Sequence, residues 1–193
     1  MQNDLIRNRL NTSAEIKVSI SNDELLVSEI MKISNAMVNA FKSGNSVYFC
    51  GNGGSAADAQ HLAAEFSGRF YIDRKPLPSE ALHCNTSFLT AVGNDYGYEN
   101  VYSRLIEAIG KPGDILVGIS TSGNSPNILK AFATARAKEM ITVCFTGQGG
   151  GRMAGTTDYL IQVPSADTPR IQESHITVGH IICEIVETTL FSK

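Results

Sequence analysis

The sequence predicts an α/β protein built on a parallel sheet. Short apolar runs alternate with segments of helical periodicity along most of the 193 residues. The runs are rich in β-branched and aromatic residues, and loops rich in Gly or Ser follow several of them. This alternation is typical of βαβ units, in which helices cover both faces of a buried parallel sheet. No Pro- or Ser-rich linker divides the chain, so we expect a single domain spanning residues 1–193.

The first 43 residues are predicted to be helical. Apolar residues between Leu25 and Phe41 recur at spacings of three to five, which is the stripe of an amphipathic helix. Gly44 follows as a C-terminal stop signal.

The sheet and its crossover helices are expected in residues 46–164. The predicted strands are 46–50, 114–120, 140–147 and 158–164, with 79–84 as a weaker candidate. A strand, loop and helix at 46–67 are echoed by a second such unit at 114–137. Ligands of open α/β sheets bind beyond the carboxyl ends of the strands, where these loops lie. A closing helix is expected over about 170–191.

Composition argues against several classes of partner. The net charge is −3, so no basic excess exists to neutralise nucleic acid or an anionic membrane. The N-terminus lacks the pattern of a signal peptide, and no run of about 18 apolar residues predicts a membrane span. The cysteines are widely spaced within apolar segments, which favours reduced, buried thiols in a cytoplasmic protein. They are Cys50, Cys84, Cys144 and Cys183.

The loop after the first strand reads Gly51-Asn52-Gly53-Gly54-Ser55. Its glycines permit positive φ and a close approach of ligand to backbone. We expect Ser55 to be the N-cap of the next helix, with Asp58 completing a capping box. The spacing matches neither a P-loop nor a dinucleotide-binding loop. The loop is therefore either an anion site at a helix N-terminus or a tight turn without a ligand.

The loop after the next strong strand carries four hydroxyl groups, on Ser120, Thr121, Ser122 and Ser125. Pro126 suits the first helical position, which makes Ser125 the expected N-cap. The hydroxyls either cap the helix or wrap a phosphate group with neutral donors. Two such loops at equivalent strand ends favour phosphate binding.

Two helices carry candidate metal-binding or acid–base groups. His61 and Glu65 are spaced i and i+4 among apolar neighbours, which suits a shared metal, an acid–base pair, or a weak surface pair. The closing helix carries Gln172, His175 and His180 among β-branched residues. Gln172 and His180 lie about 12 Å apart along an ideal helix, which is far for one ion. Nitrogen, carboxylate and amide donors together would suit Zn²⁺ or a similar ion.

Several motifs resemble those of one family. CGNGGSAADAQHLAAEF, VGNDYG, GISTSGNSPN, GQGGGRMAG and RIQESHITVGH are similar to the corresponding stretches of the bacterial phosphoheptose isomerases, which are sugar-isomerase (SIS) domain proteins. The resemblance covers essentially the whole chain. It implies a three-layer α/β/α sandwich with a central parallel five-stranded sheet, similar to flavodoxin and Rossmann folds. It also implies a homotetramer, with N-terminal helices used in oligomerisation and active sites at subunit interfaces.

The resemblance also implies an activity and a set of site residues. The activity is isomerisation of sedoheptulose 7-phosphate to D-glycero-D-manno-heptose 7-phosphate, the first step towards ADP-heptose for lipopolysaccharide core or surface polysaccharide. Glu65 and His180 match the catalytic residues. The matches to the zinc ligands are His61, Glu65, Gln172 and His180. The matches to substrate-binding residues are Asn52, Gly53, Gly54, Glu65, Asn94, Asp95, Ser120, Thr121, Ser122, Ser125 and Gln172.

Ketose–aldose interconversion needs a base beside the α-carbon, an acid near the carbonyl oxygen and stabilisation of an enediol. Our hypothesis gives these proton transfers to Glu65 and His180, with zinc as the sole cofactor. Two alternatives remain: a non-catalytic SIS protein that binds the bacterial replication initiator, and a phosphosugar-sensing regulatory domain. The initiator-binding group lacks the carboxylate and imidazole that match Glu65 and His180, and this chain has both.

Overall fold

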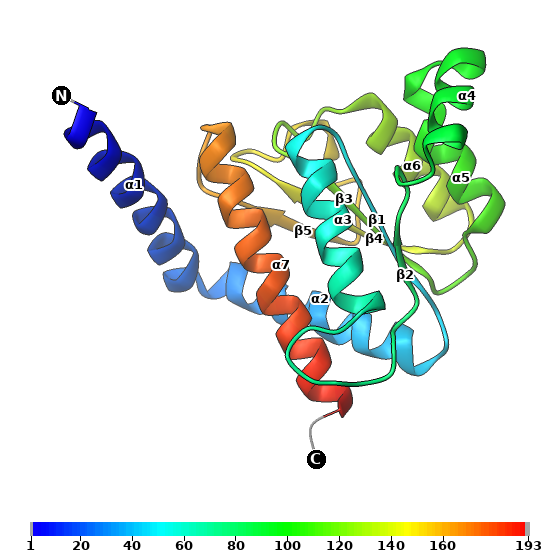
Figure 1. Ribbon diagram of the computed structural model, residues 1–193, viewed down its shortest axis with the longest axis horizontal. Helices are drawn as coiled ribbons and strands as arrows, with labels where there is room; N and C mark the ends of the chain where they lie inside the picture. The colour runs from blue at the N-terminus through cyan, green and yellow to red at the C-terminus, as the bar shows by residue number, and fades with distance from the viewer. Residues whose placement is uncertain (1, 192–193) are drawn as a thin grey trace.

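The computed structural model describes residues 2–191, and within them the strands form one parallel sheet (Figure 1). The strand order is β2-β1-β3-β4-β5. Every neighbouring pair is parallel. This sheet confirms the predicted fold class. The strands are β1 Val47–Gly51, β2 Ser79–Ala81, β3 Ile115–Ser120, β4 Ile141–Thr146 and β5 Tyr159–Gln162.

Helices cover both faces of the sheet and complete the three layers. One face packs on α2, α3 and α7, and the other on α4, α5 and α6. Alternate strand residues point to opposite layers: Phe49 and Val117 lie in the first core, whereas Cys50 and Leu116 lie in the second. The helices are α1 Gln2–Asn22, α2 Glu24–Lys42, α3 Gly54–Ser67, α4 Thr86–Tyr96, α5 Val101–Ile109, α6 Pro126–Ala137 and α7 Thr168–Phe191, with 3₁₀ turns η1 Tyr98–Asn100 and η2 Gly151–Met153.

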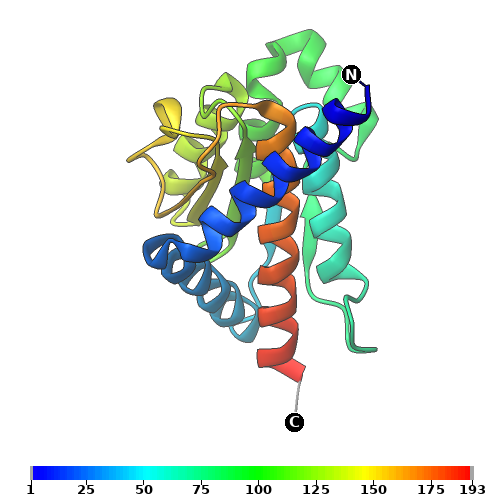
Figure 2. The same ribbon diagram turned by 90° about the vertical axis from the view of Figure 1, so that its left-hand side faces the viewer.

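Helix α1 extends away from the sheet and crosses the first half of α7 (Figure 2). The Ser13 hydroxyl donates to a Glu173 carboxylate oxygen over 2.7 Å, and Arg170 donates to the Arg9 carbonyl over 2.9 Å. Apart from Ile20, no residue of the described part of α1 is fully buried. Most of the apolar surface of α1 therefore faces outward in the single chain.

The strand order places a crevice between β1 and β3. After β1 the chain passes into α3 on one face, and after β3 it passes into α6 on the other. Because the two connections diverge, the carboxyl ends of these neighbouring strands leave an opening. This is the switch point at which sheets with the order 2-1-3-4-5 bind ligands.

The beginning of α3 differs from the expectation, because Gly53 rather than Ser55 is the N-cap. Ser55 is buried within the helix, and no side chain caps its first turn. The turn is too tight for the predicted arrangement, since a Cβ atom on Gly51 would lie 2.3 Å from the Ser55 carbonyl oxygen. Asp58 Oδ2 is buried without a hydrogen bond in the described structure. The predicted capping box is therefore wrong.

Two further expectations are answered by the described residues. All four cysteines are free, and Cys50, Cys144 and Cys183 are buried as predicted, but Cys84 is exposed just beyond β2. Among residues 2–191, no helix combines the length and apolar character needed to cross a membrane.

Candidate active site

A polar cleft of about 340 Å³ lies at the switch point, beyond the carboxyl ends of β1 and β3. It brings together both predicted loops and the first turns of α7. Its lining residues are Asn52, Gly53, Gly54, Ser55, Ile119, Ser120, Thr121, Ser122, Ser125, Thr168 and Gln172. The glycine loop and the hydroxyl loop therefore belong to one site.

The glycine loop is held rigidly by the Asn52 side chain. Asn52 Nδ2 donates to Asn127 Oδ1 over 3.0 Å, and Asn127 Nδ2 donates back to Asn52 Oδ1 over 2.9 Å. The Tyr98 hydroxyl also donates to Asn52 Oδ1, over 3.1 Å. Since this oxygen already accepts two bonds, the amide of Asn52 mainly fixes the loop. The exposed backbone of Gly53 and Gly54 is left facing the cleft.

The hydroxyl loop lies opposite. Ser125 is the N-cap of α6 and Pro126 is its first residue, as predicted, but the Ser125 side chain does not cap the helix. Its Oγ instead lies 2.9 Å from Ser120 Oγ. The Ser122 side chain is exposed, and Thr121 is half-buried. Ser122 Oγ accepts a hydrogen bond from the Asn124 N–H over 3.2 Å. All four hydroxyl-bearing residues line the cleft, which suits an anion that accepts several neutral hydrogen bonds.

A second glycine-rich segment, residues 147–155, supports the hydroxyl loop from behind. The Met153 N–H donates to the Gly123 carbonyl over 3.0 Å, and the Arg152 N–H donates to Asn124 Oδ1 over 3.0 Å. A Cβ atom on Gly123 would lie 2.0 Å from the Gly150 carbonyl oxygen. The two loops pack backbone against backbone, so both need glycine at the contact.

His61, Glu65 and His180 converge further along α3 and α7. His61 Nε2 lies 3.0 Å from Glu65 Oε1 and 2.9 Å from His180 Nε2. The candidate ligand atoms of all three residues lie within 4.8 Å of one another. The His61 side chain is 50% exposed and that of Glu65 22%, so the cluster is open to one side. Two imidazoles and a carboxylate meet here within a single chain.

This donor set fits a tetrahedral metal ion. Bonds of 2.0–2.1 Å around Zn²⁺ would separate neighbouring ligand atoms by roughly 3.3 Å. The two distances measured from His61 Nε2, 3.0 and 2.9 Å, are close to this value. Burial and the neighbouring His61 lower the pKa of His180, against an opposing effect of Glu65. A neutral imidazole is the form that binds a metal. Burial raises the pKa of nearby Asp58 to about 6, although His61 opposes this shift.

Gln172 lies with the cleft rather than with this cluster. A Cβ atom on Gly54 would meet the Gln172 amide at 2.7 Å. Gly54 is seven residues before His61, or roughly 10 Å along the helix. One chain therefore brings together three of the four predicted metal ligands, and Gln172 as a fourth ligand stays a prediction. Helices α3 and α7 pack against each other within one chain.

Other candidates lie outside this arrangement. Asn94 and Asp95 are exposed on α4, where Asn94 Nδ2 donates to Asp95 Oδ1 over 2.8 Å, and neither lines the cleft. His175 is fully buried, and its Nε2 lies 3.0 Å from the Thr146 carbonyl oxygen. Burial lowers its pKa to about 4, partly offset by this hydrogen bond. His175 is therefore a core residue.

Some residues at the cleft were missed by the sequence argument. Ser55 had been assigned to capping, and Thr168 lies at the start of α7 without any motif around it. Asn127 and Tyr98 act through Asn52, and no local pattern links them to it. Only Asn127 carried a signal, because it directly follows the hydroxyl loop and Pro126.

A family model and curated relatives match most of this chain. The family model described as "SIS domain" matches residues 14–147. A phosphoheptose isomerase from Aneurinibacillus thermoaerophilus is 52% identical over 189 residues, covering 98% of this chain and 96% of the relative. Phosphoheptose isomerase 2 from Campylobacter jejuni is also 52% identical, covering 99% of this chain and 95% of the relative.

Two solved structures of phosphoheptose isomerases have nearly the same fold as this chain. A phosphoheptose isomerase from Francisella tularensis superimposes with a TM-score of 0.93 at 34% identity, covering 97% of this chain and 99% of the other. One from Neisseria gonorrhoeae gives a TM-score of 0.91 at 38% identity, covering 97% of this chain and all of the other.

Proposed function

Because this chain belongs to the phosphoheptose isomerase family of SIS-domain proteins, we propose that its cleft binds a sugar phosphate and that its His61–Glu65–His180 cluster catalyses the reaction. The enzyme is an aldose–ketose isomerase. It converts sedoheptulose 7-phosphate to D-glycero-D-manno-heptose 7-phosphate, a reaction consistent with ADP-heptose synthesis. The assignment of roles to individual residues is our proposal.

The observation that carries the proposal is the separation between cleft and cluster. Gly54 and Gln172 border the cleft, and their helices reach His61 and His180 after seven and eight residues. That distance is roughly 10–12 Å along the helices. It is comparable to the length of an extended seven-carbon sugar phosphate. A phosphate held by the hydroxyl loop would leave C1 and C2 near the cluster.

The chain's own residues supply the proton transfers. The Glu65 carboxylate would remove the proton beside the carbonyl and return it to the neighbouring carbon. His180, kept neutral by burial and by His61, retains one ring N–H that can donate to the developing oxyanion. Ser120, Thr121, Ser122 and Ser125 would hold the phosphate, and Gln172 a sugar hydroxyl. Asn94 and Asp95 remain proposed substrate contacts, on surface that this chain leaves exposed.

The metal-binding residues in this proposal are His61, Glu65 and His180. Gln172 stays a predicted fourth ligand, although this chain places its amide beside Gly54 at the cleft. Bound there, Zn²⁺ would supply a Lewis acid that polarises the substrate carbonyl. A carboxylate that binds a metal is a weaker base than a free one. Glu65 therefore serves one of these roles at a time, or the ion acts mainly in holding the site.

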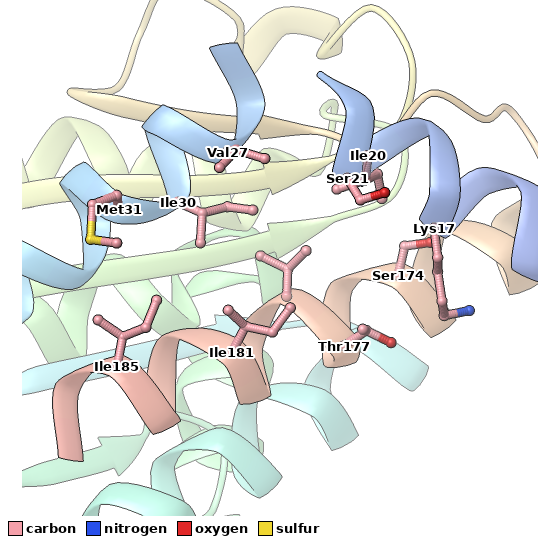
Figure 3. Close-up of a pocket in the computed structure, with 11 residues that line it drawn as sticks. Lys17, Ile20, Ser21, Val27, Ile30, Met31, Ser174, Thr177, Ile181 and Ile185 are labelled. Carbon is pink, nitrogen blue, oxygen red and sulfur yellow. The ribbon is translucent and has the colours of Figure 1, made fainter. Parts of the chain in front are cut away.

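We also propose that the protein is a homotetramer with active sites where subunits meet. An apolar groove of about 250 Å³ lies between α1, α2 and α7, and Figure 3 shows Ile20, Ile30, Ile181 and Ile185 pointing into it. Large apolar side chains of the same three helices are also exposed: Leu5, Ile6, Leu10, Val18, Leu25, Val27, Met31 and Ile181. An apolar groove with several exposed apolar side chains on the helices that form it is typical of a protein–protein contact.

Incubation of the purified protein with sedoheptulose 7-phosphate tests the proposal. We expect formation of the aldose 7-phosphate by the protein as isolated. We also expect loss of that activity after dialysis against a chelator, with recovery on adding Zn²⁺. Elemental analysis before and after dialysis provides the control. Full activity with no metal in the sample would exclude a catalytic zinc, and absence of aldose from the untreated protein would exclude the isomerase.

A further inference from the structure

A buried ion pair joins the segment after α3 to the second half of α7. Arg74 Nε donates to Glu187 Oε1 over 2.8 Å, and the two side chains are only 2% and 1% exposed. Burying a charge this completely costs folding free energy unless its polar atoms are paired with an opposite charge and with hydrogen-bond partners. The contacts of both groups therefore indicate what the pair holds in place.

Glu187 accepts hydrogen bonds from consecutive backbone N–H groups. Those of Tyr71 and Ile72 reach its Oε2 over 2.7 and 2.9 Å, and that of Phe70 reaches its Oε1 over 3.0 Å. Burial alone would raise the pKa of Glu187, but these N–H groups and Arg74 outweigh it and hold the pKa below its ordinary value. The carboxylate is thus charged and ties the segment 70–72 to α7.

Arg74 completes the connection by binding the end of α3. Its guanidinium donates to the carbonyls of Glu65 and Phe66 over 2.8 and 2.9 Å. These carbonyls belong to the last turn of α3. The carbonyl groups of a last helical turn have no hydrogen-bond donors within the helix. A cation there also interacts favourably with the helix dipole. Arg74 therefore fixes the turn that carries Glu65.

The same segment reaches His180. The ring of Phe70 lies 5.6 Å from the ring of His180, measured between centroids, with 33° between their planes. His180 and Glu187 are seven residues apart on α7, so both face the segment after α3. One ion pair is thus connected to the turn of Glu65 through carbonyls and to the ring of His180 through Phe70.

We infer that Arg74 and Glu187 are positioning residues, which hold α3, Phe70 and α7 in the one arrangement where Glu65 and His180 meet. This inference rests on the proposed function of the cluster. Neither side chain lines the cleft, so substrate affinity does not depend on them directly. Loss of the pair is expected to lower kcat with little effect on KM.

The test compares Glu187→Gln with Asp114→Asn. Asp114 is a matched control, because it is also a buried carboxylate that accepts backbone N–H bonds, from Ser46 and Lys111, at the start of β3 and away from the site. Below the unfolding temperature we expect kcat of Glu187→Gln to fall by about 10- to 100-fold, since small displacements of catalytic groups cost this much. KM should change less than about 2-fold, and Asp114→Asn should keep its kcat despite lower stability.

Phe70→Leu, which keeps the backbone bond to Glu187, covers the case in which Glu187→Gln fails to fold, and we expect it to lower kcat as well. Zn²⁺ titration of the metal-free proteins gives a readout independent of turnover, with weaker binding expected for Glu187→Gln and Phe70→Leu than for Asp114→Asn.

Wild-type kcat and Zn²⁺ affinity in the folded variants would overturn the inference, as would equal losses in the Asp114 control. An inactive wild type with the same order of Zn²⁺ affinities would instead overturn the isomerase and leave the positioning role standing.

Discussion

His175 and His180 lie five residues apart on α7 and have different surroundings. His175 packs against Phe145 of β4, with 5.7 Å between ring centroids, and is fully buried. His180 faces His61 and Glu65 at the partly open cluster. The residue pattern marked both as notable and did not separate them, whereas the resemblance to the isomerases singled out His180. Their difference depends on which layer each ring meets, and a helical pattern does not specify the partner.

His175 makes stability depend on pH. Its pKa of about 4 in the folded protein lies below the ordinary value of 6.5. Between these values only the unfolded chain takes up the proton, so stability is full above about pH 6.5 and falls as the pH drops towards 4. For this buried ring the loss is on the order of 3 kcal/mol.

Denaturant unfolding at pH 7 and pH 4.5 measures this effect. We expect the wild type to lose more free energy of unfolding over this interval than His175→Gln, which has no titrating ring. The comparison cancels the contributions of other acidic groups. An identical pH dependence in both proteins would show that His175 binds its proton equally well in the folded and unfolded states, which would contradict the lowered pKa.

At the scale of elements, the apolar runs predicted the central strands β1, β3 and β4 well because these strands are buried on both faces. The predicted 114–120 and the observed β3 Ile115–Ser120 differ by one residue. The start of α3 was predicted wrongly, since Ser55 and Asp58 matched a capping pattern while the tight turn at Gly51 began the helix earlier. A capping pattern in the sequence therefore predicts where a helix begins only if the backbone before it makes no tight turn.

The pairing of α3 with α7 depends on Gly179. A Cβ atom there would lie 2.6 Å from both methyl groups of Leu62, which is fully buried and has little room to move. Gly179→Ala should therefore push the helices apart, at a cost of about 1–3 kcal/mol for overpacking. It should also weaken Zn²⁺ binding, because His61 and His180 are the neighbours of these two residues.

Gly93→Ala is the matched control for this substitution. Gly93 is also helical, in α4, and a Cβ atom there would meet nothing within 4 Å. Alanine should stabilise it by up to about 1 kcal/mol through helix propensity. Thermal unfolding of both variants provides the comparison. A gain of stability in Gly179→Ala similar to that of Gly93→Ala would contradict close packing of α3 on α7.

At the scale of the whole molecule, many apolar side chains of the N-terminal helices are exposed to solvent in the single chain. The exposed fractions are 67% for Leu10 and 84% for Leu25. The sequence predicted helices here, and only the resemblance to a tetrameric family implied what covers them. Periodicity shows that a helix has an apolar face but not whether that face packs within the chain or against another copy.

Leu10→Asp tests the proposed use of this surface. A carboxylate buried in a contact between subunits is costly, so we expect the tetramer to dissociate into smaller species by light scattering. Ala133→Asp, which places the same charge on the exposed surface of α6, should leave the mass unchanged. A tetrameric Leu10→Asp protein, or a wild type that is monomeric at all concentrations, would refute the proposed interface.

The central claim is that Glu65 and His180, brought together by α3 and α7 of one chain, perform the proton transfers. Its most direct test is steady-state turnover of sedoheptulose 7-phosphate by the wild type, Glu65→Gln and His180→Gln, with circular dichroism to verify folding. We predict that each substitution lowers kcat by about 100-fold or more, as expected for loss of a general acid or base. Near-normal turnover by both folded variants would contradict the claim.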